Sequence, residues 1–211
     1  MKLILLGPPG VGKGTQANLL EKKIQVPKIS TGDILRGEIQ GQTELGKKAE
    51  RFIHDGKLVP DDVVIDIIKN RLQKSDCRSG FILDGFPRTL PQAQALKKIT
   101  SIDYVIYLKV EEEELIRRLE GRRTCFRCAK MYHVLFTPPK KESICDDCGG
   151  DLIQRKDDHR DTISKRLQEY DRLTKPLLEY YKKQKNLKEV NGLASVEDVF
   201  KCLLAKVETS R

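Results

Sequence analysis

A glycine-rich segment near the start of the chain constrains its fold more than any other feature. Residues 7–15 read Gly-Pro-Pro-Gly-Val-Gly-Lys-Gly-Thr, directly after the apolar run Leu3–Leu6 and directly before a helical pattern, Gln16–Lys23. Backbone N–H groups of such a loop surround an anion, the following helix adds the positive end of its dipole, and Lys13 can reach the outer phosphates of a nucleotide. A surface turn rich in glycine and proline would not need the lysine. The segment therefore predicts a strand, a phosphate-binding loop and a helix, in that order.

The loop departs from the common pattern at one position. Ser or Thr usually follows the lysine, and its hydroxyl contacts Mg²⁺. This chain has Gly14 there and Thr15 one place later. We therefore expect part of the metal coordination to come from elsewhere, through a carboxylate that acts directly or through water.

Length and composition limit the class of protein. A chain of 211 residues, 38% hydrophobic and 34% charged, can bury one α/β core with small insertions. No apolar stretch approaches a membrane span and the apolar start is too short for a signal peptide, so we expect a cytoplasmic protein with no membrane partner. The net charge of +9 indicates either a nucleic-acid binder or arginines that converge on nucleotide phosphates. The chain has no basic tail and no basic–aromatic alternation, which favours the second and predicts no nucleic-acid partner.

Apolar runs alternate with helical patterns along most of the chain. The helical patterns include Asp61–Lys74 and Asp161–Lys185, and Pro176 predicts a break in the second near Lys175. Strands that alternate with helices predict a parallel sheet covered on both faces, with ligands beyond the carboxyl ends of the strands. The expected strands are Lys2–Leu6, Pro27–Ile29, Phe81–Asp84, Tyr104–Val110 and Leu187–Val190.

Two segments interrupt this alternation. Thr31–Val59 has helical patches and several glycines but no strand pattern. Arg122–Asp158 holds paired cysteines and few large apolar groups, and could not bury enough surface to fold alone. Both are expected to be lobes inserted into the core.

Four of the six cysteines form two Cys-x₂-Cys pairs separated by sixteen residues: Cys125 with Cys128, and Cys145 with Cys148. This spacing predicts a tetrahedral zinc site of four thiolates with no open position, which is structural and not catalytic. A nucleic-acid zinc ribbon, free thiols and an iron–sulfur cluster remain as alternatives. The single residues Cys77 and Cys202 are interpreted as buried or partly buried thiols.

A second motif is expected to lie opposite the glycine-rich loop. Phe81–Thr89 is an apolar strand followed by Asp84, a turn and Arg88. At the end of a strand Asp84 could hold Mg²⁺, and Arg88 could bind a phosphate through two N–H groups. The alternative is that Asp84 caps a helix or a turn.

The order and spacing of four motifs resemble the adenylate kinases of the bacterial, long-lid type. These motifs are Gly7–Thr15, Ile29–Arg36, Phe81–Thr89 and Arg155–Asp158, and the resemblance covers essentially the whole chain. The Gly14-Thr15 departure is the usual form in that family. The resemblance implies a P-loop NTPase-like, doubly wound parallel five-stranded α/β sheet with two mobile lobes. We expect a core of residues 1–29, 60–121 and 159–211, an AMP-binding lobe of residues 30–59, and a zinc-binding lid of residues 122–158.

The resemblance also implies which residues bind the acceptor. Thr31 would contact the adenine of AMP, Arg36 and Arg88 would hold its phosphate, and Gln92 has the donor and acceptor needed to read an adenine edge. Without the motif, Gln92 would be interpreted as an exposed helix residue. The full expected AMP site is Thr31, Arg36, Lys57, Leu58, Val59, Gly85, Arg88, Gln92, Arg155 and Arg166.

Arginines around the lid are implied to converge on ATP and the transferred phosphate. Taken singly, each would more often be a solvated surface charge. Asp157 and Asp158 either pair with basic groups or solvate the hinge of the lid. The expected ATP site is Gly10, Val11, Gly12, Lys13, Gly14, Thr15, Arg118, Arg122 and Ala194. Many relatives carry Lys-Pro in place of Ala194-Ser195. The expected catalytic set is Lys13, Arg88, Arg122, Arg155 and Arg166.

These expectations combine into one reaction, the reversible transfer of a phosphoryl group from Mg·ATP to AMP to give two ADP, by a monomer with structural Zn²⁺. The AMP phosphate is already an anionic nucleophile, so no general base is needed, and catalysis is positioning plus charge neutralisation. The alternatives are a kinase for another nucleoside monophosphate, such as UMP or CMP, and a nucleic-acid-binding ATPase with a zinc ribbon.

Overall fold

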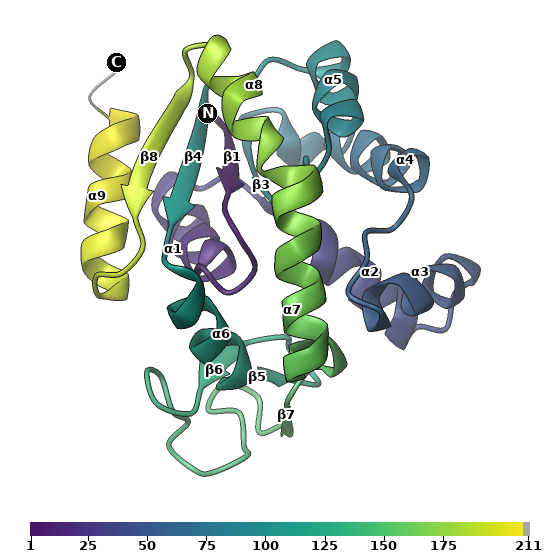
Figure 1. Ribbon diagram of the computed structural model, residues 1–211, viewed down its shortest axis with the longest axis vertical. Helices are drawn as coiled ribbons and strands as arrows, with labels where there is room; N and C mark the ends of the chain where they lie inside the picture. Colours follow the sequence, from purple (N-terminus) through teal and green to yellow (C-terminus); the bar gives the residue numbers. More distant parts are fainter. Residues whose placement is uncertain (209–211) are drawn as a thin grey trace.

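Five parallel strands form the centre of the molecule (Figure 1). The computed structural model describes residues 1–208. The strand order β2-β3-β1-β4-β8 places β1, which leads into the glycine-rich loop, in the middle of the sheet. All five predicted strands are confirmed, with ends shifted by one residue at most. They are β1 (Lys2–Leu6), β2 (Lys28–Ser30), β3 (Phe81–Asp84), β4 (Tyr104–Lys109) and β8 (Leu187–Asn191).

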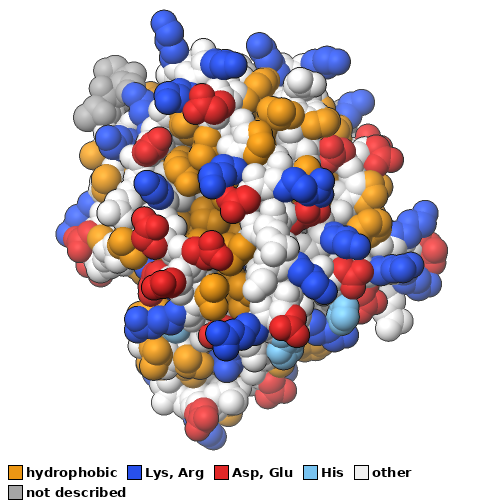
Figure 2. All heavy atoms as spheres, viewed as in Figure 1, with side chains coloured by type: hydrophobic (Ala, Val, Ile, Leu, Met, Phe, Trp, Pro, Cys, Tyr) orange, Lys and Arg blue, Asp and Glu red, His pale blue; other side chains and the backbone are white. Residues whose placement is uncertain are grey.

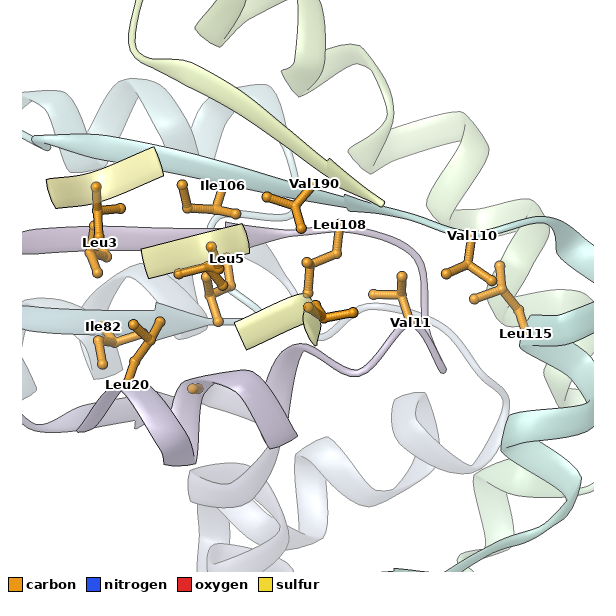
Figure 3. Packing of buried hydrophobic residues seen from close by; sticks show 14 of the residues in the cluster. Leu3, Leu5, Val11, Leu20, Ile82, Ile106, Leu108, Val110, Leu115 and Val190 are labelled. Atoms are coloured by element: carbon orange, nitrogen blue, oxygen red, sulfur yellow. The ribbon is translucent and has the colours of Figure 1, made fainter. Parts of the chain in front are cut away.

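Alternate residues of β1 feed two separate hydrophobic clusters, because successive side chains of a strand point to opposite faces. Leu3 and Leu5 belong to the cluster that Figure 3 shows in part, and Ile4 and Leu6 belong to the other. The first cluster packs under α1 (Lys13–Ile24), α6 (Glu112–Glu120), α7 (Arg160–Glu169) and α9 (Val196–Glu208). The second packs under α4 (Asp61–Leu72), α5 (Leu90–Ile99) and α8 (Pro176–Lys183). The doubly wound arrangement is confirmed.

The expected break in the long C-terminal helical pattern is present. After α7 the chain widens into a π-helical turn, η3 (Tyr170–Thr174), and α8 begins at Pro176. Proline suits the first residue of a helix, because its missing N–H would have no partner there. The chain also forms two short 3₁₀ turns, η1 (Ser75–Cys77) and η2 (Lys156–Asp158).

The first inserted segment is helical, as its sequence predicts. It holds α2 (Thr31–Gln40), capped by the Ser30 hydroxyl, and α3 (Glu44–His54), capped by the Thr43 hydroxyl. A Cβ at Gly46 would overlap the carbonyl of Glu38, so glycine allows the two helices to approach closely.

The second inserted segment holds a small antiparallel sheet of order β6-β5-β7, which sequence analysis missed. Its strands are β5 (Arg122–Cys125), β6 (Met131–His133) and β7 (Leu152–Ile153), and runs of two to four residues carry too little alternation to be recognised. The hydrophobic cluster of this segment is small and consists of Cys125, Tyr132, Cys145 and Leu152.

On the surface, charges of both signs are interspersed, with Lys and Arg densest along the upper edge in Figure 2. Within residues 1–208 no helix combines the length and apolar character that crossing a membrane requires. Cys77 is buried, as expected, but Cys202 is exposed and that expectation was wrong. The inward stripe of α9 is Val199, Leu203 and Val207, and Cys202 lies beside it.

Candidate functional site

A cavity of about 1080 Å³ opens at the carboxyl ends of the strands, between the sheet and the two inserted segments. It lies where a doubly wound sheet is expected to bind ligands. Every residue that the sequence predicts for nucleotide binding lines this one cleft. The set is Gly10, Val11, Gly12, Lys13, Gly14, Thr15, Thr31, Arg36, Lys57, Leu58, Val59, Asp84, Gly85, Arg88, Gln92, Arg118, Arg122, Arg155, Arg166 and Ala194.

The glycine-rich loop turns sharply from β1 into α1. Gly10 and Gly12 adopt left-handed backbone angles, with φ of 85° and 102°. A Cβ at Gly10 would lie 2.8 Å from Leu119 and 2.9 Å from the Leu115 carbonyl, so glycine lets the loop pack against α6. Gly12 caps α1 without a side-chain bond, which leaves the first N–H groups of that helix for an anion.

Lys13 lies across the loop it follows. Its Nζ donates to the carbonyls of Gly7 and Pro8 at 2.7 and 2.9 Å. Burial, opposed by Asp84 and assisted by the charges of Arg88, Arg166 and Arg122, lowers the pKa of Lys13 to about 7. This concentration of positive charge around one ammonium group marks a place built to receive several negative charges.

Gly14 lies between the core and the lid. A Cβ on it would lie 3.3 Å from Asp84 Oδ2 and 2.9 Å from the Met131 methyl group of β6. The Asp84 carboxylate at the end of β3 therefore faces the residue where the common motif carries a hydroxyl. It is in a position to hold a divalent cation beside the loop, directly or through water.

The predicted acceptor residues meet at the turn after β3. The Thr31 hydroxyl and Arg88 Nε both donate to the carbonyl of Gly85, at 2.9 and 2.8 Å. Burial lowers the pKa of Arg88 to about 10, assisted by the nearby charges of Arg166 and Arg36. A guanidinium at that pKa remains charged at neutral pH and suits a phosphate.

Gln92 is almost completely buried, with 1% of its surface exposed, yet it lines the cleft. Its Oε1 accepts from the backbone N–H of Arg88 at 2.7 Å, and its Nε2 donates to Asp61 Oδ1 at 2.7 Å. The alternative interpretation as an exposed helix residue is excluded. The Asp61 contact was missed, because nothing in the spacing of residues 61 and 92 relates the two.

Arg36 lies in the wall formed by α2. It donates to Asp33 at 2.7 Å, and Lys28 lies 3.2 Å from the other oxygen of that carboxylate. Burial alone would raise the pKa of Asp33, but Arg36 and Lys28 hold it well below its usual range. The arginine is thus held by an ion pair that a stronger anion could replace.

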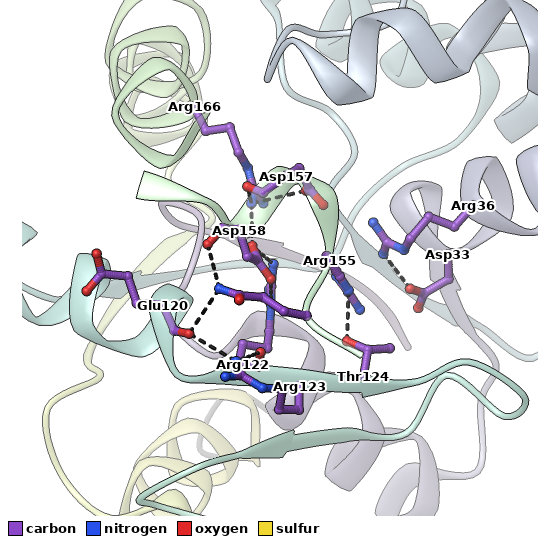
Figure 4. A network of polar contacts seen from close by, with 11 residues as sticks. Asp33, Arg36, Glu120, Arg122, Arg123, Thr124, Arg155, Asp157, Asp158 and Arg166 are labelled. Atoms are coloured by element: carbon purple, nitrogen blue, oxygen red, sulfur yellow. Dashed lines mark hydrogen bonds and ion pairs between the residues drawn. The ribbon is translucent and has the colours of Figure 1, made fainter. Parts of the chain in front are cut away.

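Four charged groups, Arg122, Asp157, Asp158 and Arg166, are part of the network of polar contacts in Figure 4. Arg122 donates to Asp158, and Arg166 donates to Asp158 Oδ1 at 2.8 Å and lies 3.1 Å from Asp157 Oδ2. Burial alone would raise the pKa of Asp157, but Arg166 and the other arginines lower it. Of the two alternatives for Asp157 and Asp158, the structure supports pairing, since both are buried.

The remaining predicted arginines are also held in place. Arg155 Nε donates to Thr124 Oγ1 at 2.9 Å, and burial with Arg122 and Arg36 nearby lowers its pKa to about 9. Arg118 donates to the Gly192 carbonyl at 3.0 Å. This bond links α6 to the turn that contains Ala194, which is exposed at the edge of the cleft.

The four paired cysteines converge. Their Sγ atoms all lie within 4.8 Å of one another, and no other cluster of this kind occurs among residues 1–208. The Cys125–Cys148 and Cys128–Cys145 pairs are 3.4 and 3.6 Å apart. Sulfurs at the corners of a tetrahedron with Zn–S bonds of about 2.3 Å would be roughly 3.8 Å apart, so the cluster fits such an ion.

Several further residues line the same cleft that the motifs in the sequence did not indicate. Lys130, Met131, Tyr132 and His133 enter it from the lid, and Thr174 enters from the π-helical turn. The lid residues lie on or beside strands that were not predicted. Thr174 lies just before the break predicted near Lys175, so the sequence indicated an irregular backbone at this position but not its place in the cleft.

Known proteins of one family resemble this chain over nearly its full length. A family model described as "Adenylate kinase" matches residues 5–186. An adenylate kinase of Geotalea daltonii is 55% identical over 204 residues, covering 94% of this chain and 95% of that protein. Adenylate kinases of Caldicellulosiruptor saccharolyticus and Archaeoglobus fulgidus are each 50% identical, covering 97% and 99% of this chain and 97% and 98% of those proteins.

Proposed function

The chain belongs to the adenylate kinase family and is a nucleoside monophosphate kinase, and we propose that the residues of its cleft act in the following roles. The reaction is reversible phosphoryl transfer from ATP to AMP, giving two ADP. The observation that carries the assignment of roles is that one cleft contains both the phosphate loop with Lys13 and a second anion site around Arg88. Two anion sites in one cavity suit transfer between two nucleotides better than hydrolysis of one.

On the donor side, the loop Gly10–Thr15 holds the ATP phosphates through its backbone N–H groups and the first turn of α1. Lys13 leaves its two carbonyl partners for the outer phosphates. Arg118 and Ala194 border the place of the ATP base. Mg²⁺, bound with ATP and held by Asp84 directly or through water, supplies charge neutralisation on the phosphates.

On the acceptor side, Arg36 and Arg88 hold the AMP phosphate, and Thr31, Gly85 and Gln92 with the segment 57–59 surround its base. Arg122, Arg155 and Arg166 neutralise the charge that develops on the transferred group. The AMP phosphate attacks without a general base, and closure of the two lobes excludes water that would hydrolyse ATP.

We propose three units: a core (residues 1–29, 60–121 and 159–211, of which 209–211 lie outside the described residues), an AMP-binding lobe (30–59) and a lid (122–158). The four cysteines would hold Zn²⁺, which keeps the lid folded and takes no part in the chemistry. We further propose a cytoplasmic monomer with no nucleic-acid or membrane partner. A reducing compartment keeps the four thiols available for a metal.

The test is a coupled assay with ATP and a panel of monophosphates, applied to the wild type and to Lys13→Met. We expect AMP to be the preferred acceptor, and the variant to lose roughly 1000-fold or more in kcat because the developing charge loses its cation. Lys22→Met, at an exposed position of the same helix, is the matched control and should retain activity. Preference for UMP or CMP would support the alternative kinase, and near-wild-type turnover of Lys13→Met would refute the proposed role of Lys13.

A further inference from the structure

The carboxamide of Gln92 lies between one group that can only donate a hydrogen bond and one that can only accept it. A backbone N–H, that of Arg88, donates to Oε1, and a carboxylate oxygen, that of Asp61, accepts from Nε2, both at 2.7 Å. A peptide N–H can only donate and a carboxylate can only accept. The orientation of the amide is therefore fixed by its neighbours.

Those neighbours are themselves held. The second oxygen of Asp61 accepts from the Thr89 hydroxyl at 2.8 Å, and Thr89 in turn accepts from the Gln92 backbone N–H at the start of α5. The carbonyl of Arg88 accepts from the Thr174 hydroxyl at 2.8 Å. Asp61, the first residue of α4, thus joins the starts of two helices, and neither partner of the amide is free to turn away.

One acceptor lone pair and one N–H of the carboxamide remain unused, since the group has two of each. The pairing edge of adenine offers one donor, its 6-amino group, and one acceptor, N1. Hypoxanthine, the base of IMP, offers the reverse: an acceptor at O6 and a donor at N1. A free glutamine could serve either base by turning its amide over.

We propose that Asp61 is a specificity-determining positioning residue, which fixes Gln92 for a 6-amino purine and against a 6-oxo purine. The inference rests on the proposed acceptor site, with the base at Gln92. Turning the amide over would set Nε2 against the Arg88 N–H and Oε1 against the Asp61 carboxylate. Two hydrogen bonds would be lost and two repulsive contacts formed, so IMP would meet a mismatch that the site cannot relieve.

The test compares AMP and IMP as acceptors in the wild type, Asp61→Asn and Asp62→Asn. An asparagine in place of Asp61 can present either an oxygen or an N–H to Gln92, which removes one side of the constraint. We expect the AMP-to-IMP ratio of kcat/KM to fall roughly tenfold in Asp61→Asn, the effect of one hydrogen bond to a charged group, with KM for ATP unchanged. Asp62 is the next residue of α4 and is exposed, so Asp62→Asn removes the same charge from the same helix end and should leave the ratio unchanged.

An unchanged ratio in a folded Asp61→Asn enzyme, with wild-type KM for ATP, would overturn the inference. Failure of the wild type to phosphorylate AMP would instead refute the proposed function. Should Asp61→Asn not fold, NMR of the ¹⁵N-glutamine-labelled wild type gives the answer. The side-chain amide protons of Gln92 are expected to exchange with water much more slowly than those of the exposed Gln73, and exchange at the same rate in both would contradict the constraint.

Discussion

The two inserted segments cover the same cleft but are stabilised in different ways. The segment 30–59, the lobe proposed to bind AMP, contributes Leu35, Ala49 and Val59 to the large cluster beneath the sheet, so its helices are continuous with the core. The lid contributes no residue to either large cluster, and its own hydrophobic cluster is Cys125, Tyr132, Cys145 and Leu152, which includes two of the four thiols. Several of its apolar side chains, Phe126, Leu135 and Phe136 among them, are exposed.

The difference separates two sources of folding free energy. Burial of apolar surface stabilises a segment only where there is a common core to join. A segment of short strands far from that core needs another source, and a bound ion provides one. Loss of the metal should therefore affect the lid alone, and loss of apolar contacts should affect the lobe and the core together.

The largest effect is expected on removing a thiol, in Cys145→Ser, or on stripping the metal with a chelator. Structural zinc sites contribute on the order of 10 kcal/mol of binding free energy, more than the small lid cluster can replace. Limited proteolysis should cut within residues 122–158 while residues 30–59 stay resistant, and native mass spectrometry should show one zinc ion in the wild type only. Cys202→Ser, at an exposed cysteine of α9, is the control and should change neither result.

A metal-free native protein would remove the zinc hypothesis. Equal cleavage of both segments after chelation would contradict their separate stabilisation, because the fold of residues 30–59 would then depend on that of the lid.

The next effect in size is expected for Leu35→Ala in the lobe. Leu35 is 6% exposed and packs in the core cluster, so its truncation should cost about 3 kcal/mol of unfolding free energy. Urea titration followed by circular dichroism measures the loss, and zinc content should be unchanged. A cleavage pattern confined to the lobe, without any loss of global stability, would show that the lobe is not part of the core cluster.

The smallest effect concerns acid stability at the hinge of the lid. The pKa of Asp157 is lower in the folded chain than its ordinary value of 3.8, because the arginines around it outweigh its burial. A carboxyl with a depressed folded pKa stabilises the fold at pH values above its unfolded pKa, and this contribution is lost as pH falls below about 4. Unfolding free energy measured from pH 6 to pH 3 should therefore fall less steeply in Asp157→Asn than in the wild type. Identical slopes would mean that Asp157 is not held by the arginines.

Features built from neighbouring residues were predicted from the sequence. Contacts between residues far apart in the sequence, and strands of only a few residues, were not. The phosphate loop, the strand that ends in Asp84 and the cysteine pairs are each contiguous, so their residue types and spacing were sufficient to predict them. The lid strands were too short to produce a periodic pattern. The Asp61–Gln92 bond joins two helix starts 31 residues apart, and only the packing of α4 on α5 brings them together.

The space above Gly14 determines what a substitution at this position of the loop would meet. A serine or threonine introduced at position 14, as in the common motif, would place its Cβ 2.9 Å from the methyl group at the end of the flexible Met131 side chain and 3.3 Å from Asp84 Oδ2. Restoring the common motif would thus displace the end of the Met131 side chain and bring the new side chain against the Asp84 carboxylate. Glycine at position 14 leaves room for Met131 of the lid and for the Asp84 carboxylate beside the loop, in the place where the common motif has a hydroxyl group.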